Sequence, residues 1–173
     1  NSYYLDGSFV QTLPDDVRTA IAASGIRNSH LTSIAPTGTI SQTCDNVSSG
    51  IEPVWSYETR RAINTPSGQM YAEAKDYGVA YLGTRGRLAR EVTPRDHVNV
   101  LAAAQPFIDS AISKTVNVPH TLPWQEFKDV YMHAYKSGAK SCATFTDGGS
   151  RGGLLSDAVA CFVDPITGER GCE

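Results

Sequence analysis

A short segment rich in hydroxyl groups, Pro36-Thr37-Gly38-Thr39-Ile40-Ser41, has the composition of an anion-binding loop. Proline stiffens the entry to the segment, and glycine allows a ligand to approach the backbone closely. Three hydroxyls and several free amides within six residues can surround a phosphate. An ordinary turn that caps a helix has a similar composition and is, on composition alone, the commoner explanation. The Gly-Lys-Ser/Thr ending of a P-loop is missing, which disfavours a Walker-type ATPase.

Cysteine side chains give a weaker indication of chemistry. Four cysteines in 173 residues, at positions 44, 142, 161 and 172, are too few for a secreted disulfide scaffold, so we expect a reducing compartment. Cys142 lies in a predicted strand and is expected to be a small buried side chain. A turn between Cys161 and Cys172 would bring their thiols together; the alternative is two unrelated thiols.

Histidine and glutamate side chains leave several interpretations open. The four histidines, at positions 30, 97, 120 and 133, share no metal-ligand spacing with cysteines or carboxylates, so no metal site is expected. His97 and His133 fall on predicted helices and are expected to be half-exposed. Glu52, which precedes Pro53, is either a buried hydrogen-bond acceptor or a functional carboxylate.

Helices and strands alternate along the chain and must position these side chains. Pro14 begins a predicted helix that ends at Gly25, and Thr93 caps a second helix that begins at Pro94. The clearest helical periodicity runs from Thr121 to Ser137. We further expect strands over 30–35, 113–119 and 141–146, a helix over 68–76, a short helical segment over 107–111, and a tail or small hairpin over 151–173 that turns at 164–168.

This order of elements predicts the fold class α/β. Strand, helix, strand, helix, strand is typical of parallel α/β units with right-handed crossovers. We therefore expect strands near 31–35, 114–118 and 141–145 to form one mostly parallel sheet. Helices near 94–104 and 123–137 should pack on one face of that sheet. The expected division is a barrel segment over residues 1–150 and a tail over residues 151–173.

Composition and charge exclude several functional classes. A formal net charge of −3 argues against broad electrostatic binding to nucleic acid or to an anionic membrane. The hydrophobic fraction of 40% is enough for the core of one domain. No apolar run approaches the roughly 20 residues of a membrane span, and no leader opens the chain, so a cytoplasmic location is expected. The chain begins without methionine, which suggests a piece of something longer.

Four segments together resemble the C-terminal part of a ribonucleotide reductase large subunit. Their order and spacing are most similar to the adenosylcobalamin-dependent class, class II, and the resemblance covers residues from about 28 to 151. The most specific feature is Pro-Thr-Gly-Thr-Ile-Ser followed some ten residues later by Gly-Ile-Glu-Pro. The four segments are HLTSIAPTGTIS at 30–41, NVSSGIEP at 46–53, SKTVNVP at 113–119 and GAKSCATFTDGGSR at 138–151.

The resemblance implies a fold, a binding loop and a cofactor. The fold would be a ten-stranded α/β barrel, to which this chain contributes the last strands. The loop would hold the phosphates of a ribonucleotide substrate through Thr37, Gly38, Thr39, Ile40 and Ser41. Thr144-Phe145 stands where classes that import a radical from a second subunit carry a tyrosine pair, which favours radical generation on adenosylcobalamin. The resemblance assigns no cobalamin-contacting residue to this chain.

Departures from the family pattern imply that the chain does not act alone. The family carries its radical cysteine and catalytic glutamate in an Asn-x-Cys-x-Glu pattern, and here the only Cys-Glu pair is Cys172-Glu173. The resemblance therefore implies an N-terminal barrel portion as partner, in the same polypeptide or as a separate chain. Redox cysteine pairs near the C-terminus of such enzymes suggest that Cys161 and Cys172 relay electrons from a thioredoxin-like reductant.

Two other hypotheses remain open on sequence grounds. The chain would also fit a nucleotide- or phosphate-binding α/β module without catalysis, which uses residues 36–41 only to hold its ligand. It would also fit a structural α/β domain whose loops are only turns. An upstream Asn-x-Cys-x-Glu segment would favour the reductase.

Overall fold

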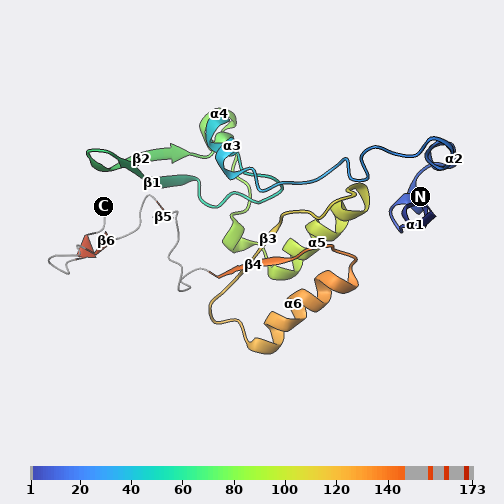
Figure 1. Ribbon diagram of the computed structural model, residues 1–173. Helices are drawn as coiled ribbons and strands as arrows, with labels where there is room; N and C mark the ends of the chain where they lie inside the picture. The colour runs from blue at the N-terminus through green and yellow to red at the C-terminus, as the bar shows by residue number, and fades with distance from the viewer. Residues whose placement is uncertain (1, 147–155, 158–161, 164–169, 172–173) are drawn as a thin grey trace.

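The computed structural model describes residues 2–146, 156–157, 162–163 and 170–171, and Figure 1 shows their arrangement. The α-helices are α1 (Ser2–Leu5), α2 (Asp15–Ser24), α3 (Gly38–Thr43), α4 (Tyr77–Leu82), α5 (Pro94–Ala104) and α6 (Trp124–Lys136). Short 3-10 helices are η1 (Val10–Thr12), η2 (Ala89–Glu91) and η3 (Gln105–Phe107). The strands are β1 (Glu58–Thr65), β2 (Gly68–Lys75), β3 (Thr115–Val118), β4 (Ala143–Thr146), β5 (Ser156–Asp157), β6 (Phe162–Val163) and β7 (Arg170–Gly171).

The core of the fold is the α/β unit formed by α5, β3, α6 and β4. Strands β3 and β4 are parallel, with Thr115 opposite Ala143, and α6 forms the crossover between them (Figure 1). Both helices cover the sheet, as their predicted apolar faces require. The buried side chains of this core are Val98 from α5, Val116 and Val118 from β3, and Val130 and Ala134 from α6.

The predicted start of α5 and the predicted end of α2 are confirmed, whereas α6 begins at Trp124 and not at the predicted Thr121. The Thr93 hydroxyl accepts a hydrogen bond from the Asp96 amide at 3.1 Å, and proline occupies the first turn of α5. Helix α2 ends at Gly25, which has a φ of 75°. Between α5 and β3, the helical segment predicted over 107–111 is wrong in position, because η3 ends at Phe107 and Ile108 has an extended conformation.

The predicted strand over 31–35 is reduced to a single parallel bridge between Ile34 and Ile112. The Ser113 amide donates to the Ile34 carbonyl at 2.8 Å, so this segment does lie beside the chain that leads into β3. A longer ladder does not form because the Asp109 carboxylate accepts the amides of Leu31 and Thr32 at 2.5 and 2.9 Å. A side chain has thus taken the place of strand carbonyls.

The predicted helix over 68–76 is wrong. Strands β1 and β2 form an antiparallel hairpin in which Thr65 pairs with Gly68 across a two-residue turn (Figure 1). Gly68 has a φ of 129°, a conformation that favours glycine, and the Thr65 hydroxyl donates to the Gly68 carbonyl at 2.7 Å. The turn at Pro66-Ser67 therefore pairs the following residues with β1, and they form a strand although their sequence pattern predicts a helix.

The described strands form three separate sheets and do not close into a barrel. Their orders are β2-β1-β5, β3-β4 and β6-β7. Strands β6 and β7 pair antiparallel on either side of residues 164–168, which lie outside the described residues together with Cys161 and Cys172. The ten-stranded barrel and the division at residue 150 stay predictions. No helix in the described part of the chain combines the length and apolar character of a membrane span.

Candidate functional site

The hydroxyl-rich loop turns sharply into α3. Thr37 has a left-handed conformation, with φ 49° and ψ 24°, and directly precedes the first helical residue, Gly38. The first intrahelical hydrogen bond runs from the Ser41 amide to the Thr37 carbonyl at 2.8 Å. The amides of Gly38, Thr39 and Ile40 therefore have no acceptor within the helix, and these three residues are exposed. Such amides can bind an anion.

Two of the three hydroxyls in the loop hold the loop itself. The Thr37 hydroxyl accepts a hydrogen bond from the Gly50 amide at 2.8 Å. The Ser41 side chain is buried, and its hydroxyl donates to the Val47 carbonyl. Thr39 is exposed, and the described contacts include no hydrogen bond from its hydroxyl to the rest of the chain. The sequence predicted where the loop lies but not this division of roles.

Gly38 has no packing reason to be glycine within the described chain. A Cβ at this position would meet no heavy atom within 4 Å. Gly50 differs, because its φ is 56° and a Cβ would lie 2.9 Å from the Ala35 carbonyl oxygen. Glycine is therefore required at position 50, where the chain packs closely against Ala35 at the start of the loop. At position 38 the space beside the glycine is open to a ligand.

Asp109 anchors the extended segment that leads into the loop. Its carboxylate accepts the amides of Leu31 and Thr32, and its own amide donates to the Thr32 hydroxyl at 3.1 Å. These backbone hydrogen bonds, from Leu31 first, lower the pKa of Asp109. On the other side, Lys140 donates to the Asp109 carbonyl at 2.5 Å. Residues that are far apart in sequence thus fix the start of the loop.

A partly buried ion pair joins the Gly-Ile-Glu-Pro segment to the start of β3. The Lys114 ammonium donates to Glu52 Oε2 at 2.5 Å, to the Thr115 carbonyl at 2.7 Å and to His97 Nδ1 at 2.8 Å. Glu52 Oε1 accepts the Thr115 amide at 2.5 Å. The side chain of Lys114 is 1% exposed and that of Glu52 is 21% exposed. All three Lys114 protons are used, and Glu52 is a partly buried acceptor that ties the Gly-Ile-Glu-Pro segment to β3.

His97 completes this cluster, and the prediction that it is half-exposed is wrong. Its side chain is buried, and Nε2 lies 3.2 Å from the Ala89 carbonyl, to which it donates when Nδ1 accepts from Lys114. Burial, and then the Lys114 charge, lower the pKa of His97. The missed signal is its helical spacing, because position 97 lies on the same face as Leu101. His133, also predicted half-exposed, is so and contacts Asn99 Oδ1 at 2.9 Å.

Replacing His97 by glutamine is expected to remove a loss of stability at acid pH. Because the folded pKa lies below 6.5, the unfolded chain takes up a proton near that pH while the folded chain does not. The free energy of unfolding is then complete above 6.5 and falls as the pH decreases below it. One proton contributes a slope of at most about 1.4 kcal/mol per pH unit.

Urea denaturation between about pH 7 and pH 5 measures this slope. The His97→Gln variant should show a shallower slope than the wild-type chain. An unchanged slope in His97→Gln would mean that another group titrates.

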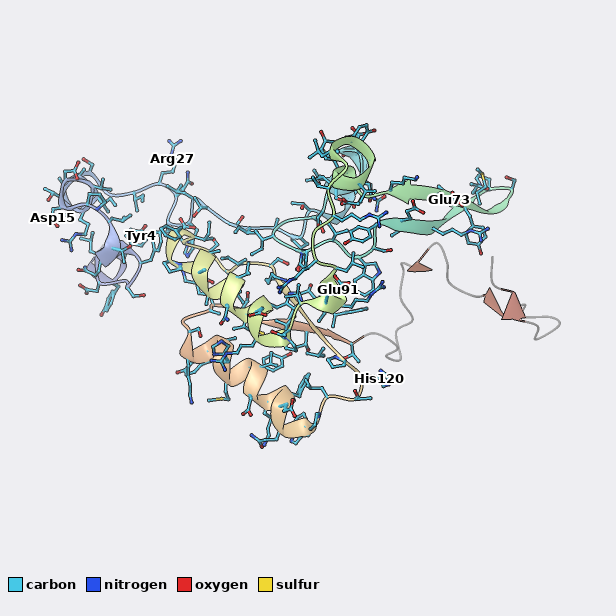
Figure 2. All side chains as sticks on the ribbon, turned by 180° about the vertical axis from the view of Figure 1, so that it is seen from behind. Tyr4, Asp15, Arg27, Glu73, Glu91 and His120 are labelled. Atoms are coloured by element: carbon cyan, nitrogen blue, oxygen red, sulfur yellow. The ribbon has the colours of Figure 1, made fainter. Side chains whose placement is uncertain are left out.

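A cavity of about 390 Å³ lies at the carboxyl ends of β3 and β4. Trp55 and Phe145 form an aromatic wall, with ring centroids 5.6 Å apart and an interplanar angle of 79°. Asn117, the register partner of Phe145, also lines the cavity. Glu91 and His120 line it as well, and both are labelled in Figure 2. The sequence analysis did not identify this cavity.

The described cysteines do not form a redox pair. Cys44 and Cys142 are both free thiols. Cys142 is partly buried beside the valine core, and burial raises its pKa, which lowers the reactivity of its thiol. Within the described ranges, no group of three or more histidine, cysteine, aspartate or glutamate side chains is placed to hold a metal ion.

Comparison with known proteins gives the family. The model of the ribonucleotide reductase barrel domain matches residues 8–82 and 74–145. A vitamin B12-dependent ribonucleoside-diphosphate reductase of Mycobacterium tuberculosis (strain CDC 1551 / Oshkosh) is 31% identical over 163 residues, covering 77% of this chain and 23% of the relative. A vitamin B12-dependent ribonucleotide reductase of Streptantibioticus cattleyicolor is 28% identical over 164 residues, covering 75% of this chain and 27% of the relative.

A solved structure supports the same fold. The crystal structure of a B12-dependent, class II ribonucleotide reductase superposes with a TM-score of 0.60 at 15% identity, covering 82% of this chain and 23% of that one. The chain thus spans about a quarter of the length of these relatives. With matches over most of its length and an α/β fold of the same barrel type, the chain belongs to the ribonucleotide reductase barrel-domain family.

Proposed function

We propose that this chain is the C-terminal portion of the catalytic barrel of an adenosylcobalamin-dependent ribonucleotide reductase. In this role it supplies the last strands of a ten-stranded barrel and the loop that holds the substrate phosphates. The observation that carries the proposal is the exposed turn of free amides at residues 38–40, which follows an extended segment aligned parallel with the chain entering β3. Ligands of α/β folds commonly bind beyond the carboxyl ends of parallel strands.

Each residue of the loop has a distinct part in this proposal. The amides of Gly38, Thr39 and Ile40 and the Thr39 hydroxyl contact phosphate oxygens. Thr37 and Ser41, whose hydroxyls contact Gly50 and Val47, hold the turn in the binding conformation. Glycine at position 38 permits close approach of the phosphate, since no neighbouring atom of the described chain fills that space.

Reduction itself requires residues that this sequence does not carry. The sequence holds no Asn-x-Cys-x-Glu pattern, so the thiyl radical would form on an N-terminal barrel portion, in cis or as a separate chain. The chain alone is therefore proposed to be inactive. Cys161 and Cys172 are proposed to pass electrons from a thioredoxin-like reductant to the active site by thiol–disulfide exchange.

The cavity beside Trp55 is not proposed as a cobalamin site. The cavity beside Trp55 measures about 390 Å³, which is too small for a corrin macrocycle with its axial groups. The adenosylcobalamin that the names of the relatives imply is therefore proposed to bind mainly to other parts of the complete enzyme.

A phosphate-binding module without catalysis is the second candidate, because the same exposed amides would serve it. The two candidates differ once the N-terminal portion with its Asn-x-Cys-x-Glu segment is joined to this chain. A reductase then forms deoxyribonucleotides in the presence of adenosylcobalamin and a dithiol, whereas a binding module does not.

Titration with inorganic pyrophosphate tests the loop. The Thr39→Val variant should bind about tenfold more weakly, because it loses a hydroxyl hydrogen bond to a charged oxygen worth about 1.5 kcal/mol. Thr43→Val is the matched control, since the Thr43 hydroxyl donates to the Ile40 carbonyl at 2.9 Å at the other end of the same helix. In ¹⁵N NMR, the amides of residues 38–40 should shift on binding. If pyrophosphate does not bind, or binds saturably without shifting these amides, the loop is not the phosphate-binding site.

A further inference from the structure

We propose that Lys114 and Glu52 are positioning residues for the phosphate-binding loop, although neither belongs to the loop. Residues 112–115, which lead into β3 and which we call the clamp, hold both ends of the chain segment 34–52 that contains the loop. Breaking the ion pair between Lys114 and Glu52 therefore weakens phosphate binding from a distance. This inference rests on the proposed function of the loop and adds to it what keeps the loop in its binding conformation.

The clamp holds the first end of the segment through the backbone. Ile112 forms a parallel bridge with Ile34, and the Ser113 amide donates to the Ile34 carbonyl at 2.8 Å. The Ile112 side chain is buried, which fixes the position of the bridge. Pro36, the first residue of the loop, follows Ile34 by two residues, and each residue adds only two soft backbone torsions. The entry to the loop therefore has little freedom to move away from the clamp.

The clamp holds the second end of the segment through the Glu52 side chain. Glu52 Oε1 accepts the Thr115 amide at 2.5 Å, and Glu52 Oε2 accepts from the Lys114 ammonium at 2.5 Å. The Lys114 side chain is almost completely buried, and its ammonium also donates to the Thr115 carbonyl and to His97 Nδ1. Hydrogen bonds between charged groups are stronger than those between neutral groups. This end of the segment is therefore fixed by one backbone donor and one charged donor.

A short turn connects Glu52 with the loop. The Glu52 amide donates to the Ser49 carbonyl at 3.0 Å, and the Ser48 hydroxyl donates to the Glu52 carbonyl at 2.7 Å. Gly50 lies inside this turn, and its amide donates to the Thr37 hydroxyl at 2.8 Å. Because the turn is bonded within itself, a displacement of Glu52 moves the turn as a unit and breaks the contact between Gly50 and Thr37.

The conformation of Thr37 makes this contact necessary. Its φ of 49° lies in the left-handed region, which a β-branched residue rarely adopts unless the surrounding structure holds it there. Thr37 directly precedes Gly38, so its torsions set the direction of the exposed amides of residues 38–40. When Thr37 relaxes to an ordinary conformation, these amides turn away from their binding arrangement. The clamp thus acts on phosphate affinity through the hydrogen bond from Gly50 to Thr37.

Titration of the Lys114→Met variant with inorganic pyrophosphate tests the proposal. The variant should bind about tenfold more weakly than the wild-type chain, which corresponds to about 1.4 kcal/mol, the order of the cost of one strained backbone conformation. Adding Glu52→Gln returns a neutral acceptor to the Thr115 amide and should recover part of the affinity. Glu52→Gln alone keeps the shape of the side chain and should show a smaller loss, which tests the clamp if Lys114→Met does not fold.

Val130→Ala is the control for a general loss of stability. Val130 is 8% exposed, and it packs in a cluster whose described members all lie outside the segment 34–52. Truncation creates a cavity there, so the variant should be destabilised but should bind pyrophosphate as the wild type does. In ligand-free samples, the ¹³C chemical shifts of Thr37 should leave the left-handed range in Lys114→Met and keep it in Val130→Ala.

These measurements separate the clamp from the loop. The proposal is overturned if folded Lys114→Met, or folded Glu52→Gln where Lys114→Met does not fold, binds pyrophosphate like the wild type, or if Val130→Ala weakens binding equally. If the wild-type chain itself does not bind pyrophosphate, the proposed function of the loop fails. The Thr37 shifts still test the clamp in that case, and unchanged shifts in the folded variant overturn it.

Discussion

Lys114→Met should lower the free energy of unfolding by about 3 kcal/mol, because it leaves the Glu52 carboxylate without its cation in a mostly dry site. Removal of one partner from a buried ion pair costs about 3–5 kcal/mol, and water that reaches the partly exposed Glu52 places the loss at the lower end. Methionine keeps most of the side-chain volume, so the loss reports on charge and not on a cavity. Urea denaturation at neutral pH measures it.

The chain provides a matched control for this experiment. Lys75 and Glu58 form an ion pair at 3.3 Å whose side chains are 64% and 53% exposed. Lys75→Met should change the free energy of unfolding by less than about 1 kcal/mol, since exposed pairs contribute little. Adding Glu52→Gln to Lys114→Met removes the stranded charge, keeps an acceptor for the Thr115 amide and should recover part of the loss. Equal losses from the two lysine variants would contradict the buried network.

Gly50→Ala should also cost about 3 kcal/mol. A left-handed φ of 56° costs a non-glycine residue about 1–2 kcal/mol, and the new Cβ would stand 2.9 Å from the Ala35 carbonyl oxygen, so the backbone must shift. The shift would lengthen the hydrogen bond from the Gly50 amide to the Thr37 hydroxyl and should weaken pyrophosphate binding as well. Denaturation and titration measure the two effects.

Gly83→Ala separates conformational strain from the clash. Gly83 has a similar φ of 62°, and a Cβ there would meet no atom within 4 Å. This variant should lose only about 1 kcal/mol and keep the affinity for pyrophosphate. If Gly50→Ala were no more destabilised than Gly83→Ala, the close packing of residue 50 against the loop entry would be wrong.

Local signals in the sequence were sufficient for the α/β unit. The cap at Thr93, proline at position 94 and the apolar faces of α5 and α6 are all encoded within a few residues, so both helices could be predicted, and α5 with its first residue. The parallel pairing of β3 and β4 follows from the helical crossover that connects them. Residues 68–75 could not be assigned in this way, because their strand conformation depends on pairing with β1.

Some features of the candidate site could likewise be predicted from local sequence, and others depend on long-range contacts. The sequence by itself determined where the hydroxyl-rich loop lies and, by resemblance, the family of the chain, because a binding loop and its flanking motif are short and contiguous. Only the tertiary structure decided which hydroxyls remain available, since Val47 and Gly50 must fold back to engage Ser41 and Thr37. It alone brought Glu52, His97 and Lys114 together from distant positions and set Trp55 beside Phe145. Burial and charge pairing are properties of such long-range contacts, and no local pattern carries them.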